Sequence, residues 1–496
     1  MAIKKIIGIE TEYGIISSGV TEQYVNPMTS SALLINAYLH GKRTEFDFTD
    51  ETPANDARVD SNNFAAIFPE THLVNSMLVN GARYYVDHAH PEYSSPEVSN
   101  ALEAVLYDRA GEEILKQSMI EAKKLLGSGE IIVYKNNTDS KGNSYGTHEG
   151  YLVQRSVEFV EIVNALTSHF VSRQIYCGSG KVGSEHSSRD AVDFQISQRA
   201  DFMEEHVGLE TTMKRPIVNT RDEPHADASK YRRLHVIVGD ANMCDVATFL
   251  KVGTTAFILA MLEDDVDYFK SGLIHMTEPV NAIRRYSHDV SLTQTCETDK
   301  GQMSALDIQE WLLTQAKKYS ENANLDNLGG QVALDVLETW EQTLNLLSNN
   351  PDQLFGKVDW ITKKKIIDGY VDRDNLEATS AKLQAIDVQY HDIRKDKLFD
   401  KMRTRGEIHD LVNKDDVSVA ANNPPITTRA YFRGRVLSKF AEYVHSANWD
   451  SVTLDIGDST LKRIPTAEPT KGTIDHVKSL IDECESPKEL VEKLGA

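Results

Sequence analysis

The chain is 496 residues long, with 40% hydrophobic and 26% charged residues, a composition typical of a globular protein and not of a disordered one. Its length favours one large domain with a smaller appendage. The formal net charge of −22 argues against a broad basic surface for nucleic acid.

Cysteine usage and apolar segments indicate the compartment. The four cysteines lie far apart and form no CxxC pair, so neither a disulfide framework nor a zinc ribbon is predicted, and a reducing, cytoplasmic environment is expected. The N-terminus shows no apolar segment with a cleavage site, so no export signal is predicted. The longest apolar run, 252–262, is too short to cross a membrane and predicts a buried helix.

The first predicted element is a strand over residues 6–12. Its period of two places Glu10 and Glu12 on one face and Ile7 and Ile9 on the other. Paired carboxylates on a rigid strand suit a hard cation such as Mg²⁺. An edge strand with a solvated outer face explains the same pattern, and this strand alone leaves both readings open.

Residues 41–69 form a polar, acidic segment with weak periodicity, which predicts a long mobile loop. A second strand is predicted over 83–87, where Arg83, Tyr85 and Asp87 share one face. The turn that follows adds Glu92, and Ser95 comes shortly after it. So many polar groups at one strand end favour a functional site over a structural hydrogen-bond acceptor.

Further strands are predicted over 131–134, 150–154 and 233–238. His148 precedes the second of these, and His235 lies on the third, on the same face as Arg233. Either histidine alone is more often structural. Together with Glu10 and Glu92 they could complete a metal site of nitrogen and oxygen ligands.

Three arginines stand in polar segments and are candidates for clamping carboxylates or phosphates: Arg199, Arg221 and Arg433. Each could equally form a surface ion pair. The run 178–183 lacks the spacing of a phosphate-binding loop and predicts a turn. Any nucleotide must therefore bind to a different architecture.

The second half of the chain reads as helical. Residues 304–319 predict an amphipathic helix with Ser304 and Asp307 as a capping box, and helical patterns continue to about residue 402. Within them, the basic run 363–365 predicts a solvated face. The segment 420–425, with its pair of prolines, predicts a linker, which gives domains over 1–425 and 426–496.

Several of these strings resemble one family in order and spacing. They are GIETEYG, NGARYYVDHAHPEYSSPE, YKNNTDSKGNSYGTHE, ISQRADF, NTRDEPHAD, KYRRLHVIVGDAN and TRAYFRGR, and they resemble the Pup deamidase/depupylase family, sister to the Pup ligases. The resemblance covers essentially the whole chain. It implies an α+β, glutamine synthetase-like fold: a curved antiparallel sheet cradle backed by helices, followed by a small C-terminal domain.

The resemblance also implies residue roles, with ATP and Mg²⁺ as cofactors. Asp87 would be the catalytic carboxylate, as either nucleophile or general base. The metal ligands would be Glu10, Tyr85 and Glu92, with His148 and His235 at or near the metal, and Glu12 is a further candidate. Contacts to ATP would come from Arg83, Ser95, Arg433 and Trp449, whereas Arg199 and Arg221 would face phosphates or the substrate carboxylate.

The activity implied is ATP-dependent hydrolysis of the C-terminal Gln amide of Pup, a disordered acidic protein tag, and of the isopeptide bond that joins Pup to lysines of pupylated proteins. The alternatives are a Pup–protein ligase and a small-molecule γ-glutamyl ligase. The string DHAHPEYSSPE and the position of the 41–69 segment resemble the depupylase version. An acidic partner should need local positive charge, and the candidates are Lys214, Arg215, Lys230, Arg232 and Arg233. Neither nucleic acid nor a membrane is expected as a partner.

Overall fold

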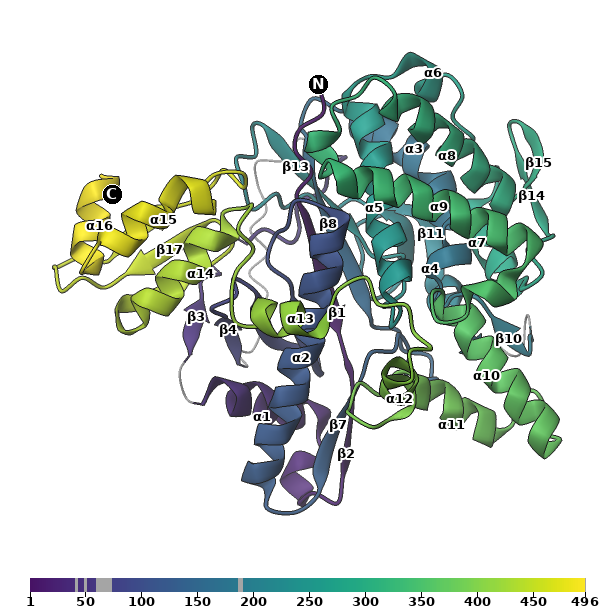
Figure 1. The fold of residues 1–496 in the computed structure, drawn as a ribbon, viewed down its shortest axis with the longest axis horizontal. Helices are drawn as coiled ribbons and strands as arrows, with labels where there is room; N and C mark the ends of the chain where they lie inside the picture. The colour runs from purple at the N-terminus through teal and green to yellow at the C-terminus, as the bar shows by residue number, and fades with distance from the viewer. Residues whose placement is uncertain (41–42, 49–50, 59–73, 186–190, 496) are drawn as a thin grey trace.

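A computed structural model describes residues 1–40, 43–48, 51–58, 74–185 and 191–495 of the chain (Figure 1). Its centre is one sheet of ten strands. In spatial order the strands are β13 (Tyr231–Val236), β8 (Thr147–Gln154), β1 (Ile7–Glu12), β6 (His90–Ser94), β5 (Arg83–Asp87), β4 (Asn75–Met77), β3 (Thr44–Phe46), β16 (Val444–Ala447), β17 (Ser451–Leu454) and β18 (Lys462–Pro465).

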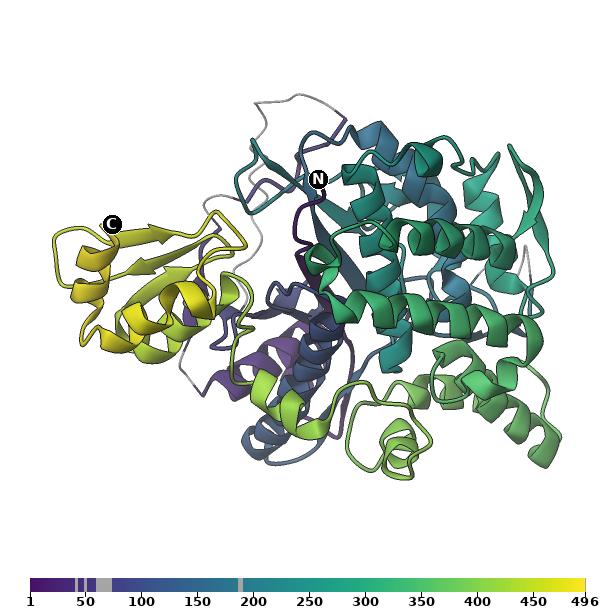
Figure 2. The ribbon, with the colours of Figure 1, turned by 45° about the horizontal axis from the view of Figure 1, so that its top comes forward.

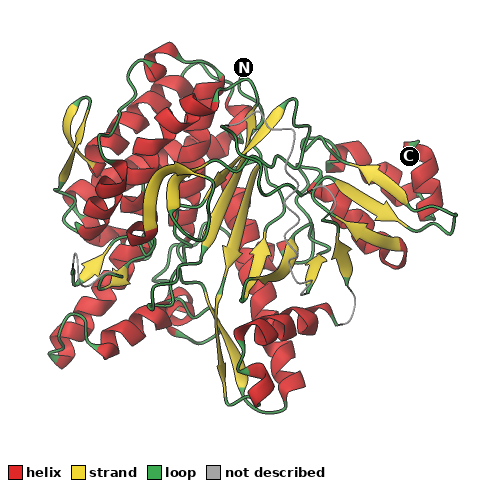
Figure 3. Ribbon diagram, turned by 180° about the vertical axis from the view of Figure 1, so that it is seen from behind, coloured by secondary structure: helices red, strands yellow, loops and turns green. Residues whose placement is uncertain are grey.

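Neighbouring strands of this sheet run antiparallel, except that β16 runs parallel to β3. Seen from behind, the strands curve in front of the helices (Figure 3). The predicted α+β class with a curved antiparallel sheet backed by helices is therefore confirmed.

Smaller two-stranded pairings surround the sheet. They are β2 (Gly14–Ser18) with β7 (Glu130–Tyr134), β9 (Lys181–Val182) with β10 (Phe194–Gln195), β11 (Met203–Gly208) with β12 (Arg215–Asn219), and β14 (Thr295–Thr298) with β15 (Gly301–Ser304). The predicted strands at 6–12, 83–87, 131–134, 150–154 and 233–238 match β1, β5, β7, β8 and β13 to within a few residues.

The helices pack mainly against one face of the sheet and against one another. Their bounds are α1 (Pro27–Leu39), α2 (Ala101–Leu126), α3 (Phe159–Ser172), α4 (Gln174–Cys177), α5 (Asp245–Glu263), α6 (Asp267–Lys270), α7 (Pro279–His288), α8 (Ala305–Ser320), α9 (Gln331–Asn349), α10 (Asp359–Asp374), α11 (Ala381–Tyr390), α12 (Leu398–Thr404), α13 (Lys414–Ala420), α14 (Ala430–Lys439), α15 (Ile474–Glu483) and α16 (Pro487–Leu494).

Helix α5 is the centre of the main hydrophobic core, and all of its residues are buried. It is long and apolar enough to pass for a membrane span, but core helices of soluble proteins meet the same criteria, so this is weak evidence for a membrane. The predicted buried helix at 252–262 lies within it. The predicted capping box of α8 is also confirmed, because Ser304 and Asp307 each accept a hydrogen bond from the other's backbone N–H.

The prediction of a solvated basic face at 363–365 is wrong for its first residue. Lys363 is fully buried, and its ammonium group donates to the Gly180 carbonyl at 2.6 Å and to Asp387 at 2.5 Å. Lys364 and Lys365 remain partly or fully exposed and pair with nearby aspartates. Charge runs predict solvation only on average, and here one position of the run faces inward and finds a buried carboxylate.

A second hydrophobic core joins the C-terminal elements to the edge of the main sheet. Residues of α14, β16, β17, β18, α15 and α16 pack together with Phe46 and Met77 of β3 and β4. Figure 2 shows this part as a lobe at one side of the molecule. The domain boundary near residue 425 stays a prediction.

The predicted loop over 41–69 is only partly covered by the structure. Residues 44–46 form β3 and not a loop, because they pair with both β4 and β16. Asp56 forms an isolated bridge to Arg221. Residues 41–42, 49–50 and 59–69 lie outside the described residues.

Candidate active site

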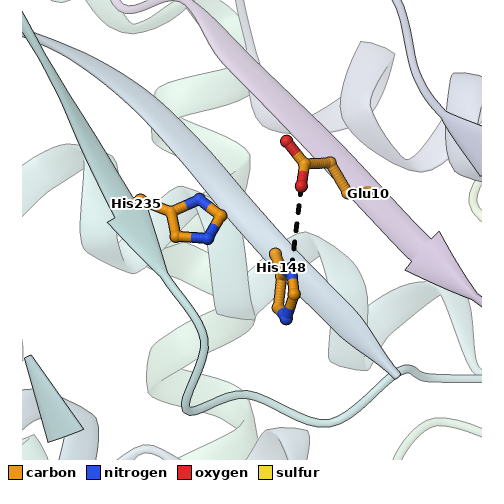
Figure 4. Close-up of side chains that lie close together, drawn as sticks. All are labelled: Glu10, His148 and His235. Carbon is orange, nitrogen blue, oxygen red and sulfur yellow. Dashed lines mark ion pairs between the residues drawn. The ribbon is translucent and has the colours of Figure 1, made fainter. Parts of the chain in front are cut away.

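The register of three strands brings an acid and two imidazoles together. Glu10 on β1 lies opposite His148 on β8, and His235 on β13 lies opposite Gly150. The Glu10 carboxylate is 3.6 Å from Nδ1 of His148, and the two imidazole rings are 5.1 Å apart (Figure 4). Ligand atoms of all three residues lie within 4.8 Å of one another.

A second cluster forms where β1 meets β5 and β6. Glu12 lies opposite Glu92, and Glu92 lies opposite Tyr85, whose hydroxyl donates to it at 2.5 Å. Carboxylate oxygens of Glu12, Asp87 and Glu92 lie within 4.8 Å of one another. Three acids therefore crowd one point of the sheet.

The surroundings separate the pKa values of these acids. Burial, together with the charges of Asp87 and Glu12, raises the pKa of Glu92 well above its ordinary value. Burial opposes ionisation of Asp87, but a hydrogen bond from His88 and its charge lower the pKa of Asp87. Burial likewise opposes ionisation of Glu10, yet the neighbouring Arg233 and the two histidines hold its pKa well below the usual range. Asp87 and Glu10 are therefore the carboxylates that stay charged at neutral pH.

The metal-free protein should lose stability as the pH rises from about 5 to about 8. Burial and the adjacent Asp87 raise the pKa of Glu12 from 4.5 to about 8, so between these values the folded chain keeps a proton that the unfolded chain has released. The loss is at most about 1.4 kcal/mol per pH unit, and less here because Glu12 is partly exposed.

Denaturant unfolding in EDTA between pH 5 and 8 measures this slope. The Glu12→Gln protein should show a flatter profile than the wild type, because the amide does not titrate. Equal slopes in the two proteins would show that Glu12 does not hold the extra proton.

Both clusters fit a divalent cation, the first with nitrogen and oxygen ligands and the second with oxygen ligands. His235 is almost fully buried, and neither of its ring nitrogens has a hydrogen-bond partner among the described residues. Buried polar atoms without partners are rare in folded proteins and indicate a missing ligand. The three acids of the second cluster lack an ion pair with any Lys or Arg of the described residues, and carboxylate oxygens are the ligands that Mg²⁺ prefers.

The predicted arginines are placed differently from one another. Arg199 is 1% exposed and donates to the Tyr145 carbonyl at 2.6 Å, while its Nε has no partner among the described residues. The buried Nε of Arg221 also lacks one. The guanidinium group of Arg433, by contrast, donates hydrogen bonds to Glu97, to the Gly81 carbonyl at 2.9 Å and to the Trp449 carbonyl at 2.8 Å. Arg433 therefore fixes the backbone of Trp449 and has few N–H groups left to bind a ligand.

A cavity opens beside the first cluster, between β1, β6 and β8 and the C-terminal lobe. It contains three of the predicted residues, Glu10, Ser95 and Trp449. Arg83 is not in its lining; the guanidinium stacks 3.9 Å above the ring of Tyr85 and donates to Asn75 at 3.1 Å. Apolar side chains and a few charged groups line it, as is typical of pockets for small ligands.

Arg233 and His225 line this cavity but were not among the predicted site residues. Arg233 lines the cavity and pairs with Glu10. Gly150 allows this approach, because a Cβ there would lie 3.1 Å from Nε of Arg233. His225 lies near Trp449 and has a left-handed backbone with φ of +46°, a strain that often marks a functional site. The shared face of Arg233 and His235 was the available signal for Arg233. His225 lies in the string NTRDEPHAD, which carries the family resemblance, but it was given no role.

The basic residues expected to attract an acidic partner do not form one free surface. Arg232 is buried against Asp222, Arg233 pairs with Glu10, and Lys230 pairs with Glu468. Lys214 remains exposed.

A curved antiparallel sheet with acid and imidazole clusters beside a cavity defines the glutamine synthetase-like class of protein. More narrowly, the chain belongs to the Pup-ligase protein family, whose pattern matches residues 5–453. It is 47% identical to the depupylase of Acidothermus cellulolyticus over 99% of both chains, and 36% identical to the Pup–protein ligase of Mycobacterium leprae over 96% of this chain and 99% of that one.

Two solved structures have folds similar to this one. One is the complex between Pup and its ligase PafA, with a TM-score of 0.81, 29% identity, and coverage of 99% of this chain and 92% of that one. The other is PafA in complex with ADP, with a TM-score of 0.74, 33% identity, and coverage of 82% of this chain and 89% of that one.

Proposed function

We propose that this protein is an ATP-dependent deamidase and depupylase, which hydrolyses the C-terminal Gln amide of Pup and the isopeptide bond between Pup and lysines of pupylated proteins. The observation that carries this choice is the graded similarity, 47% identity to a depupylase against 36% to a ligase, each over nearly the full chain. The Pup deamidase/depupylase of Mycolicibacterium smegmatis is 42% identical over 99% of this chain.

ATP is the proposed nucleotide, and the cavity beside Glu10 is its proposed site. A ligase of the same family binds ADP. Trp449 would supply an aromatic wall, Arg233 would supply a cation toward the phosphates, and Ser95 also lines the cavity. Arg83 and Arg433 would not contact ATP directly. They would support the site by fixing Tyr85 and Trp449, respectively.

Mg²⁺ is the proposed cation, held by Glu10, His148 and His235 in one cluster and by Glu12, Glu92 and Tyr85 in the other. When bound there, it would neutralise phosphate charge and polarise the amide carbonyl. Glu92 and Glu12, which favour their protonated forms in the metal-free protein, would release protons on binding.

Asp87 is the proposed catalytic group. It remains ionised next to His88, at the end of a rigid strand, where it can take a proton from water or attack the amide carbon itself. Either route adds water across the C–N bond, yields a carboxylate and releases ammonia or the lysine amine. The guanidinium groups of the buried Arg199 and the half-buried Arg221 would hold the developing oxyanion or the substrate carboxylate.

The second candidate is a Pup–protein ligase, favoured by the 0.81 TM-score to the Pup–PafA complex. Incubation with Mg-ATP and Pup ending in Gln separates the two: ammonia release and cleavage of a Pup–lysine conjugate support the hydrolase. Conjugation of Glu-ended Pup to a protein lysine, without amide hydrolysis, would identify a ligase. Turnover of free glutamate with an amine would identify a small-molecule γ-glutamyl ligase.

Replacing Trp449 by Ala should raise the KM for ATP about tenfold with little change in kcat, since an aromatic face against a base contributes about 1–3 kcal/mol. Trp449→Phe keeps a ring and should retain most of the affinity. Isothermal titration of the two variants with ADP measures the loss of nucleotide affinity, and steady-state kinetics with ATP measure KM and kcat. Unchanged ADP affinity in Trp449→Ala would place the base elsewhere.

We also propose a cytoplasmic location and a small domain over 426–496. The location is supported by four buried cysteines that form no disulfide. The domain is supported by the separate hydrophobic core of the C-terminal elements.

A further inference from the structure

Arg199 is a buried cation with little to hold its side chain. It donates one hydrogen bond, to the Tyr145 carbonyl, and its Nε has no partner among the described residues. Its charge acts on Glu12 and His148, one residue from each cluster. The direction of the guanidinium group therefore depends on how firmly its backbone is held.

One buried carboxylate accepts hydrogen bonds from much of that backbone. Asp240, 2% exposed, accepts five hydrogen bonds and forms no ion pair with a described Lys or Arg. Oδ1 accepts from the Ser197 hydroxyl at 2.9 Å and from the Arg199 N–H at 3.1 Å. Oδ2 accepts from the Gln198 N–H at 2.9 Å and from the N–H and hydroxyl of Ser179 at 2.8 and 3.0 Å.

Such an arrangement is costly unless every bond is made, because a buried charge is stable only when hydrogen bonds replace its water. Its geometry is also specific. One oxygen receives the N–H of Arg199 itself, and the other ties the preceding residue to Ser179 on a separate segment. A carboxylate of this kind fixes a loop conformation, whereas one with a single partner would not.

A second anchor holds the residue before Arg199. The Gln198 side chain donates to the Gly180 carbonyl at 2.8 Å and accepts from the Asn137 N–H at 2.8 Å. The buried Lys363 donates to the same Gly180 carbonyl. The backbone before Arg199 is therefore fixed from two sides, while its guanidinium keeps donors for a ligand.

We infer that Asp240 is a positioning residue, which fixes the turn 197–200. Arg199 then points at the anionic group of the substrate, between the cluster that contains Glu10 and the cluster that contains Glu12. This rests on the proposed function, in which Arg199 contacts the substrate. Asp240 itself touches no reacting atom.

The test is a double-mutant cycle on amide hydrolysis. Asp240→Asn keeps the shape but places an NH₂ group against N–H donors, so kcat should fall on the order of tenfold to a hundredfold with ADP affinity unchanged. In the Arg199→Ala background the same substitution should lower kcat less than about twofold, because coupled residues are not additive. A full additional loss in that background would overturn the inference, and so would a normal kcat in folded Asp240→Asn protein.

Amide hydrogen exchange gives a readout that needs no activity. Exchange at residues 198 and 199 should be at least tenfold faster in Asp240→Asn than in the wild type, and unchanged exchange would contradict the inference. If Asp240→Asn does not fold, Ser197→Ala removes one of the five bonds and should show a smaller effect with the same non-additivity.

The matched control is Glu263→Gln. Glu263 is also a buried carboxylate that accepts from the N–H of two segments, Ile3 and Gln154. It differs from Asp240 in pairing with the buried Lys5, and it lies at the other end of β8. This variant should be destabilised while kcat of the folded protein and exchange at 198 and 199 stay normal. A wild-type protein without any activity on Pup would refute the proposed function alone, since the exchange measurement would still decide the role of Asp240.

Discussion

Asp87→Asn protein is expected to lose about a thousandfold or more of its turnover with Gln-ended Pup, the size of effect expected for a general base or a nucleophile. Asn has nearly the same shape but neither takes up a proton nor attacks a carbonyl at neutral pH. Asp87 lies outside the lining of the proposed nucleotide cavity, so the affinity for ADP should change less than about threefold, a limit of about 0.7 kcal/mol. Ammonia release and titration with ADP measure the two quantities.

Asp139→Asn is a suitable control for this experiment. Asp139 accepts hydrogen bonds from the N–H groups of Lys141 and Asn143 in a surface loop and belongs to neither acid cluster. Its replacement should leave turnover within about twofold of the wild type, as for most surface substitutions. Normal turnover in Asp87→Asn would show that another group performs the chemistry.

Glu92→Gln is expected to separate stability from cation binding. In the metal-free protein Glu92 favours its protonated form, because burial and two neighbouring acids oppose its charge. An amide mimics that form, so stability in EDTA should be equal to or higher than that of the wild type. The stabilisation by Mg²⁺, about 2.7 kcal/mol at a concentration of 100 times Kd, should be almost abolished, together with turnover.

Glu112→Gln provides the opposite pattern. Glu112 is equally buried but pairs with Lys135 at 2.9 Å, so its neutralisation should destabilise the protein with and without Mg²⁺. The gain from Mg²⁺ should persist in this variant. Thermal unfolding of the wild type and of both variants, with and without MgCl₂, measures these differences in stability. A full stabilisation of Glu92→Gln by Mg²⁺ would show that Glu92 is not part of the cation site.

Local patterns in the sequence predicted many of the strands and helices correctly. The alternation in 6–12 and 83–87 correctly placed Glu10 with Glu12, and Arg83 with Tyr85 and Asp87, on shared faces. Period and capping residues likewise predicted α8. These features depend on residues a few positions apart, where sterics and side-chain alternation decide.

Long-range pairing could not be predicted in the same way. The contact of Glu10 with Arg233 depends on the register of β1, β8 and β13, whose partners lie far apart in the chain. The parallel pairing of β16 with β3 extends the main sheet into the C-terminal lobe, and it contradicts the expectation of a loop at 44–46. Lys363 was misplaced because its buried partner, Asp387, belongs to another helix.

The central claim is that groups from separate strands converge on one cation and nucleotide site. Crystals grown with ADP and Mn²⁺ in place of Mg²⁺ test it most directly, since anomalous scattering locates the ion. We predict Mn²⁺ within ligand distance of Glu10 and His235 or of Glu12 and Glu92, with the ADP base against Trp449. Mn²⁺ bound only outside both clusters, or ADP bound outside the cavity, would contradict the account.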